Sequence, residues 1–171
     1  MEINFLFFII FFAIGLVLLL ISLILKYRDS NTIKKCREVI KGKVIKYTLW
    51  GNNGVYFPIV EYVVNNKSYN QRLKYGWIVS KSSSIKSVNT KANNNPMDDN
   101  LTISRNAHLS TNPLKDQFPL GSEVDVYYNP EDPQESYVLR FVKSPLVIIL
   151  FGTSLMFIIL AVLGYIFLPG N

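Results

Sequence analysis

Hydrophobic residues gather in two long runs that enclose a polar middle. Residues 3–25 and 144–171 contain no charged side chain, whereas all 18 Lys and Arg residues lie between them. As a helix, residues 3–25 span about 34 Å at about 1.5 Å per residue, which is enough to cross a hydrocarbon core of about 30 Å. The second run begins at Pro145, a residue suited to a first helical turn. We therefore predict transmembrane helices at 3–25 and 145–168.

The alternative for the first run is a cleaved signal peptide. Such a peptide has a basic start, an apolar stretch of about 7–15 residues and a small-residue cleavage site. Here the start carries Glu2 instead of a basic residue, and the run ends in Leu-Ile-Leu-Lys-Tyr-Arg. These features favour a retained helix.

Basic residues flank the two runs on their inner sides only. Basic residues next to membrane helices favour the cytoplasmic side. The sequence therefore predicts a multi-pass protein of the inner cell membrane, with its middle in the cytoplasm and both termini outside. Residues 26–37 form a basic juxtamembrane segment, where each Lys or Arg near anionic lipid contributes roughly 1 kcal/mol. The predicted lipid-facing collar is Lys26, Arg28, Lys34, Lys35 and Arg37. Arg140 and Lys143 precede the second run and add to the count of basic residues on this side.

Small residues recur at a spacing of seven in both apolar runs. Gly15 and Ser22 share one helix face in the first run, and Ser154 and Ala161 share one in the second. Small residues allow helix backbones to approach closely in lipid. The alternative is a chance distribution in an apolar run, and the sequence leaves both interpretations open.

The middle, residues 38–142, alternates in the manner of a small antiparallel β domain. The turn at Asn65-Asn66 predicts a tight hairpin, and Pro58 should lie at an edge or a bulge because it lacks a ladder donor. The fold class predicted is an α+β membrane protein in which two transmembrane helices flank about five strands, arranged as a barrel or a sandwich. Strands are expected at 38–50, 55–64, 68–77, 124–128 and 137–142, with Tyr69, Leu73, Tyr75 and Trp77 sharing one face of the third.

Residues 80–111 form a polar insertion without a clear period. The segment contains Ser-Lys-Ser-Ser-Ser and Asn-Asn-Asn-Pro, with a short strand conceivable only near Leu101–Ile103. A long loop of this kind is uncommon inside a compact domain and is either an appended insertion or a functional loop. Because its composition buries little apolar area, we expect the segment to be dispensable for folding.

Three motifs give the chain a resemblance to a known family. They are a Gly-x-Val strand, a Tyr-x-Pro strand ending in Tyr, and a Gly-x-x-Val-x-Val-x-Tyr-x-Pro-x-x-Pro segment. The chain resembles bacterial two-helix membrane proteins that carry the domain of unknown function 3592. The resemblance implies this architecture and transfers no activity and no catalytic residue. Its positions here are Gly42, Val44, Tyr56, Pro58, Tyr62, Gly121, Val124, Val126, Tyr128, Asn129, Pro130 and Pro133.

Side chains for catalysis or metal binding are sparse. His108 and Cys36 are the single histidine and cysteine, so neither a zinc site nor a Ser-His-Asp triad has its parts. The carboxylates from Glu123 to Glu135 suggest a solvated strand face, with cation binding as the alternative. We therefore predict a non-enzyme with no cofactor and no metal.

The function predicted is that of a membrane accessory or protein-interaction module. Its partners would be the lipid bilayer and another membrane or membrane-associated protein, bound through an edge strand or the 80–111 loop. Aromatic and basic residues fall on opposite faces of the strand at 69–77, which argues against nucleic-acid binding. No small-molecule substrate is indicated. The alternative is an immunity-type or envelope-stress membrane protein.

Overall fold

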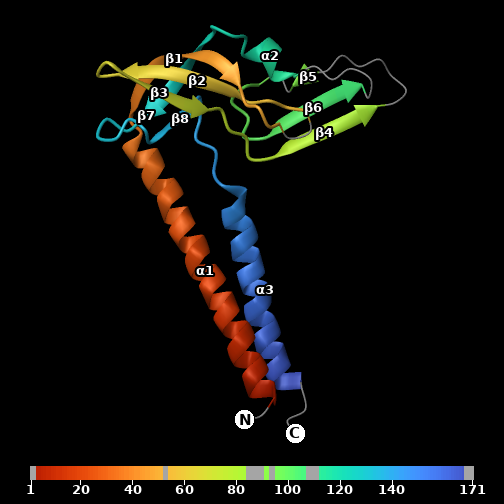
Figure 1. Cartoon of the computed structure of the whole chain (residues 1–171). Helices are drawn as coiled ribbons and strands as arrows, with labels where there is room; N and C mark the ends of the chain where they lie inside the picture. The colour runs from red at the N-terminus through yellow and green to blue at the C-terminus, as the bar shows by residue number, and fades with distance from the viewer. Residues whose placement is uncertain (1–2, 52–53, 84–90, 93–94, 107–111, 168–171) are drawn as a thin grey trace. The chain divides into compact units, whose positions relative to one another are not determined.

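The chain combines a helix pair with a small β domain. A computed structural model describes residues 3–51, 54–83, 91–92, 95–106 and 112–167 (Figure 1). The chain forms two compact units, one of Met1–Asn31 with Ser144–Asn171 and the other of Thr32–Lys143. Two long apolar helices at the termini flank a curled five-stranded antiparallel sheet, as the α+β membrane architecture predicts.

The helical unit contains two helices long and apolar enough to cross a membrane. They are α1, Ile3–Lys35, and α3, Pro145–Phe167. Helix α1 runs past the predicted end at residue 25 and through the basic segment, because Lys and Arg are good helix formers and suit a helix C-terminus. The two helices lie side by side (Figure 1), and the Ser22 hydroxyl donates a hydrogen bond of 3.1 Å to the Val147 carbonyl.

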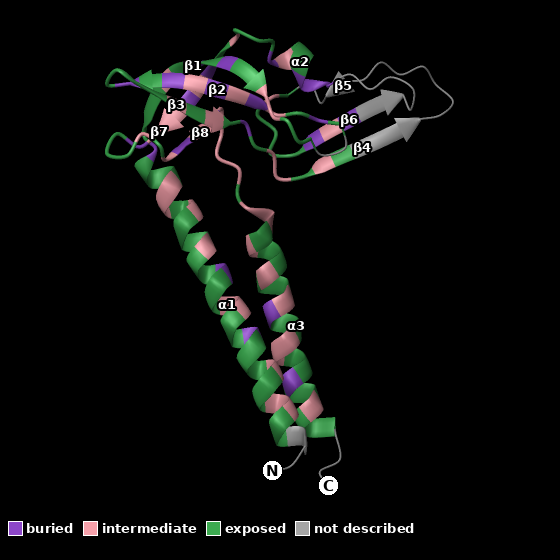
Figure 2. Cartoon of the chain, in the orientation of Figure 1, coloured by how far each residue is buried: buried purple, intermediate pink, exposed green. Residues whose placement is uncertain are grey.

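Small residues line the contact between α1 and α3. Gly15 and Ser22 are buried on α1, and Ser154 and Ala161 are buried on α3 (Figure 2). A Cβ atom at Gly15 would lie 2.8 Å from Cγ1 of Ile158, so only glycine permits this approach. The structure therefore selects the close-packing interpretation of the spaced small residues.

The main sheet has the strand order β3-β2-β1-β7-β8. The turn between β2 and β3 consists of Asn65 and Asn66, with φ values of 52° and 60°. Positive φ at both positions is the type I′ geometry, so the predicted tight hairpin is confirmed. The strands are β1 Glu38–Tyr47, β2 Pro58–Val64, β3 Lys67–Arg72, β7 Glu123–Tyr128 and β8 Ser136–Val138.

The sheet curls at Gly42 in β1. A Cβ atom there would lie 2.6 Å from Cγ1 of Val60 and 2.8 Å from the Glu61 carbonyl oxygen. Glycine at this motif position therefore lets β2 fold over β1. A bulge between Val44 and Lys46 adds to the bend.

Pro58 begins β2, which is an interior strand and not an edge. Of the two predicted alternatives, an edge or a bulge, the structure therefore shows the position beside a bulge. Pro58 pairs with Tyr47, just beyond the bulge in β1, and a first strand position tolerates the missing N–H.

Trp77 is the exception to the predicted alternation, because β3 ends at Arg72 and the Trp77 residue is 53% exposed.

The hydrophobic core lies on one face of the main sheet. The buried cluster consists of Val44, Val55, Val60, Tyr62, Val64, Leu73, Leu101, Ile103, Leu114, Phe118, Val124, Val126 and Val138.

The prediction of one long loop over residues 80–111 is wrong. The segment contributes to a second sheet of order β4-β6-β5, with β4 Ile78–Ser83, β5 Lys91–Ala92 and β6 Leu101–Asn106. The strand near Leu101–Ile103 is confirmed within β6, and a short helix, α2 Leu114–Gln117, follows. The Leu101 and Ile103 side chains of β6 are part of the core, and the polar composition of the segment did not indicate this. Residues 84–90, 93–94 and 107–111 of the predicted loop lie outside the described residues.

We predict that Leu101→Ala destabilises the β domain by about 2–5 kcal/mol, because the side chain is fully buried and its removal leaves a cavity. The matched control is Leu120→Ala, which alters a largely exposed leucine and should change stability by less than about 0.5 kcal/mol. Thermal unfolding of the full chain in detergent measures both. Equal stability of the two variants would restore the dispensable-loop interpretation.

Candidate interaction site at the open edge of the sheet

The two outer strands of the main sheet, β3 and β8, approach each other where the sheet curls round. Side chains join them at one end. Nε2 of Gln71 donates hydrogen bonds to the carbonyl oxygen of Ser136 at 2.6 Å and to its hydroxyl at 3.0 Å. The hydroxyl groups of Tyr62 and Ser136 lie 2.8 Å apart, and the Tyr62 hydroxyl also donates to the Pro133 carbonyl at 2.5 Å.

The hairpin turn fixes which backbone groups of β3 point away from β2. The residues flanking a two-residue turn, here Val64 and Lys67, exchange backbone hydrogen bonds, and bonded pairs then alternate along the hairpin. The Leu73 N–H, which donates to the Pro58 carbonyl at 3.0 Å, continues this alternation. The residues whose N–H and C=O groups point outward are Ser68, Asn70 and Arg72.

These outward groups differ in how they are satisfied. The Arg72 N–H donates to Oε1 of Gln71 at 3.1 Å, so the Gln71 side chain covers this end of the edge. The outward N–H and C=O groups of Ser68 and Asn70 have no hydrogen-bond partner among the described residues. Unpaired edge groups of this kind are a template for pairing with another extended chain.

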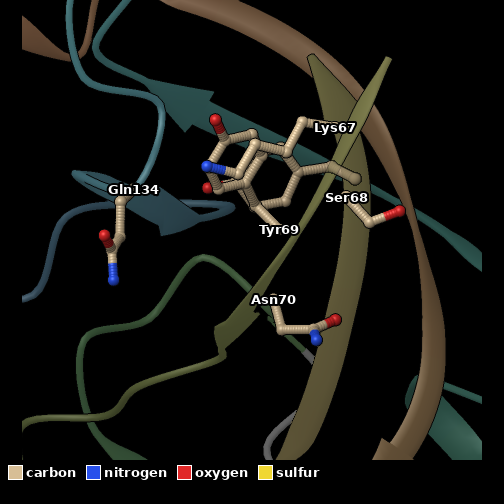
Figure 3. Close-up of a pocket in the computed structure, with 6 residues that line it drawn as sticks. Lys67, Ser68, Tyr69, Asn70 and Gln134 are labelled. Atoms are coloured by element: carbon tan, nitrogen blue, oxygen red, sulfur yellow. The ribbon is translucent and has the colours of Figure 1, made fainter. Parts of the chain in front are cut away.

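An open cavity of about 330 Å³ lies along this uncovered part of β3. Figure 3 shows Ser68, Tyr69 and Asn70 on the strand and Gln134 across from them, on the loop before β8. Lys67 and the buried Tyr62 complete the lining. The unpaired backbone groups of Ser68 and Asn70 therefore lie at the edge of this cavity. Beside it, the rings of Tyr62 and Tyr69 stack with their centroids 5.7 Å apart.

The loop that carries Gln134 also holds the last turn of α1. Oε1 of Glu135 accepts a hydrogen bond from the Thr32 hydroxyl at 2.8 Å, and Oε2 accepts one from Nδ2 of Asn129 at 3.1 Å. Nζ of Lys35 lies 3.8 Å from the same carboxylate. The Cys36 thiol donates to the Glu135 carbonyl at 3.2 Å. We call Thr32, Lys35, Cys36, Asn129 and Glu135 the helix clamp.

Cys36 is a buried thiol and only 2% exposed. Burial raises its pKa from 9.0 to about 11, and the nearby Glu135 carboxylate adds to the increase. The thiolate is therefore rare at neutral pH, which does not suit a nucleophile. Because the folded pKa exceeds the unfolded one, stability is unaffected below about pH 9 and falls as the pH rises toward 11.

The residues of the predicted collar are all exposed. Four lie on α1, and Arg37 lies between α1 and β1. Only Lys35 belongs to the helix clamp, and lipid contact of the collar stays a prediction. His108 lies outside the described residues, and no group of three metal-ligating side chains occurs in the described part of the chain.

The motif residues are mainly structural. Val44, Val124, Val126 and the half-buried Tyr128 pack in or against the core, together with Pro58. Gly121 has a φ of 84°, which favours glycine. Tyr56 and Pro130 are exposed.

Three motif residues take part in the site, and one of them, Tyr62, lines the cavity. Pro133 accepts the Tyr62 hydrogen bond, and Asn129 joins the helix clamp. Sequence reasoning missed Gln71, Ser136 and Glu135. The one available signal was that Gln71 places a polar group between the inward-facing Tyr69 and Leu73.

Comparison with known proteins gives one match. Residues 100–143 match the family described as Domain of unknown function (DUF3592), which supports the predicted family over this segment. The matched segment contains β6, α2, β7 and β8, and with them Ser136 and most of the helix clamp loop. The curated proteins and the solved structures contain no match to the chain.

We predict that Glu135→Ala releases the last turn of α1 and exposes Cys36. Hydrogen bonds to a charged group contribute about 1.5–3 kcal/mol, so maleimide should label Cys36, the single cysteine, roughly ten to a hundred times faster. Glu131→Ala removes an exposed carboxylate from the same loop and serves as the control. Unchanged labelling in Glu135→Ala, with fast labelling of the denatured chain, would show that the helix clamp does not hold this turn.

Proposed function

We propose that this chain is a membrane-anchored, non-enzymatic protein-interaction module; residues 100–143 match the DUF3592 family, whose function is unknown. Its two apolar helices anchor it, and its β domain binds an extended segment of another membrane or membrane-associated protein. The observation that carries the proposal is the open edge of β3 at Ser68 and Asn70, beside the cavity that Gln134 borders. A bound segment would extend the sheet as an added strand.

The size of this edge explains why the partner should share the membrane. Two outward residues offer up to four backbone hydrogen bonds, and each contributes about 0.5–1.5 kcal/mol net. A few kcal/mol in total supports only weak binding between freely diffusing molecules. Confinement to one membrane raises the effective concentration, so a short edge becomes sufficient.

The electrostatics of the domain support a binding role over a catalytic one. The Cys36 thiol is buried and has a raised pKa, which keeps it protonated. Asp125 of the β7 carboxylate face forms an ion pair of 2.6 Å with Lys41 on the neighbouring strand. Ion pairs between neighbouring strands are common on solvated sheet faces, where they stabilise the pairing of the strands.

We also propose that the β domain lies in the cytoplasm and both termini outside. The support is the count of Lys and Arg beside the helices, which is seven on the domain side and none on the other. On that side the exposed collar along the end of α1 would meet anionic lipid.

The test replaces Asn70 by proline and by alanine. Proline removes the outward N–H and blocks strand addition, whereas alanine keeps it. Neither change removes a β2–β3 hydrogen bond, because the Asn70 backbone groups point away from β2. A photo-crosslinking amino acid at Ser68 should form an adduct in native membranes in the Asn70→Ala background, and lose it at least severalfold in Asn70→Pro.

Two controls make the result specific. The crosslinker at Val39, an exposed position on β1, which β2 separates from β3, should not give the same adduct. Circular dichroism should show equal folding of the two Asn70 variants. An adduct that survives Asn70→Pro in a folded protein, or that forms equally at Val39, would contradict binding by strand addition.

A further inference from the structure

A second surface of the β domain adjoins the segment that leads into α3. The backbone at Gly76 lies beside Val142, with the position of a Gly76 Cβ atom 3.6 Å from the Val142 Cγ1 atom. Gly76 donates a backbone hydrogen bond of 2.8 Å to Asp99, and the next N–H, that of Trp77, donates to Oδ1 of Asn100 at 3.2 Å. These contacts lie within the unit Thr32–Lys143. They hold Trp77 close to Val142, near the last residue of that unit.

Arg140 makes further contacts between the segment before α3 and the residues next to Gly76. Its side chain is only 7% exposed, and its guanidinium lies 4.5 Å from the ring centroid of Tyr75. Nη1 donates to the Pro96 carbonyl at 2.8 Å, and Nε lies 3.5 Å from Oδ1 of Asp99. A buried cation thus joins the segment before α3 to the turn that precedes β6 and to the end of the β3 region.

Large apolar side chains are exposed on this part of the domain. Trp77 is 53% exposed, and Val79, two residues on, shares its strand face and is also exposed. The turn that Arg140 holds exposes Met97. Ile78 and Leu101, which pair across β4 and β6, point to the opposite side, toward the core. The exposed side chains are therefore not required by the core.

Chain connectivity limits how far Trp77 can lie from the bilayer. Three peptide units join Val142 to Pro145, where α3 begins, and they span at most about 10 Å. The headgroup layer occupies about 5–7 Å on each side of the hydrocarbon core, and Trp is enriched there because its ring is apolar and its N–H is polar. Trp77 is thus within reach of this layer if α3 crosses the membrane.

The charges around this surface also suit a lipid headgroup layer. Lys74 and Lys143 are exposed, lie close in the chain to Gly76 and Val142, and can meet anionic lipid. Asp98 and Asp99 are the acidic residues nearby, and the Asp99 charge is offset by Arg140.

We propose that Trp77 and Val79 form an interfacial anchor that seats the β domain in the headgroup layer of the membrane that α3 crosses. The occupant of this surface is lipid. The anchor is independent of partner binding at the β3 edge, because it uses other residues and needs no second protein. It would hold the cavity-bearing domain at the membrane surface, where a membrane-associated partner is present.

The chain supplies its own matched control, because it has two tryptophans, Trp77 and Trp50. Trp50 is 89% exposed in the loop between β1 and β2. The single-Trp variants Trp50→Phe and Trp77→Phe are reconstituted in full-length form into vesicles of phosphatidylcholine and phosphatidylglycerol, with or without brominated acyl chains. Far-ultraviolet circular dichroism verifies that both are folded.

The fluorescence of Trp77 in Trp50→Phe should be blue-shifted and fall about twofold with lipids brominated near the headgroup, as expected for an interfacial indole. Trp50 in Trp77→Phe should keep the emission of a hydrated indole and be quenched by acrylamide instead. Equal bromolipid quenching of the two residues, or none for Trp77, would overturn the anchor. A Trp77 shielded from acrylamide but not quenched by bromolipid would show that protein covers it, which would also overturn the lipid assignment.

Discussion

The β domain depends on the need to satisfy the backbone at the two free edges of a curled sheet. Ser136 carries most of this task, because its carbonyl and hydroxyl groups receive Gln71 of β3 and its hydroxyl also bonds Tyr62 of β2. These bonds join the two outer strands, β3 and β8, and close one end of the gap between them. Unpaired backbone groups are costly when buried and reactive toward other strands when exposed. The sealed end avoids the first problem, and the open end at Ser68 and Asn70 leaves backbone groups for the partner strand that we propose.

Three consecutive residues link this gap to the end of α1. Pro133 accepts the Tyr62 hydroxyl, Gln134 borders the cavity and Glu135 holds Thr32. A displacement of the last turn of α1 would therefore be transmitted to the cavity wall through a segment of three residues. These three residues connect the helix clamp to the proposed binding edge, and they lie within the segment that matches the family, whereas β3 and the end of α1 lie outside it.

Local rules identified much of the fold from the sequence. Asn65-Asn66 tolerates the positive φ of a tight turn, residues 3–25 and 145–168 are long uncharged runs, and Val124 to Tyr128 alternates cleanly, so each element follows from short-range chemistry. The insertion was misjudged because Leu101 and Ile103 are two apolar residues in a polar segment, and their burial depends on a parallel pairing with β4 that has no local signal. Trp77 was misplaced because the alternation was extended past Arg72, where β3 ends. The site itself depends on Gln71, Ser136 and Glu135, whose partners are distant in the chain and become visible only when the sheet has curled.

The central claim is that the β3 edge is open at Ser68 and Asn70 while the rest of the strand is paired. Residue-resolved amide hydrogen exchange on the full chain in lipid nanodiscs tests it most directly. The account predicts slow exchange at Tyr69 and Gln71, whose N–H groups bond β2, and fast exchange at Ser68 and Asn70. Slow exchange at Ser68 and Asn70, equal to that of their neighbours, would show that the edge is already covered and would contradict the proposed binding site.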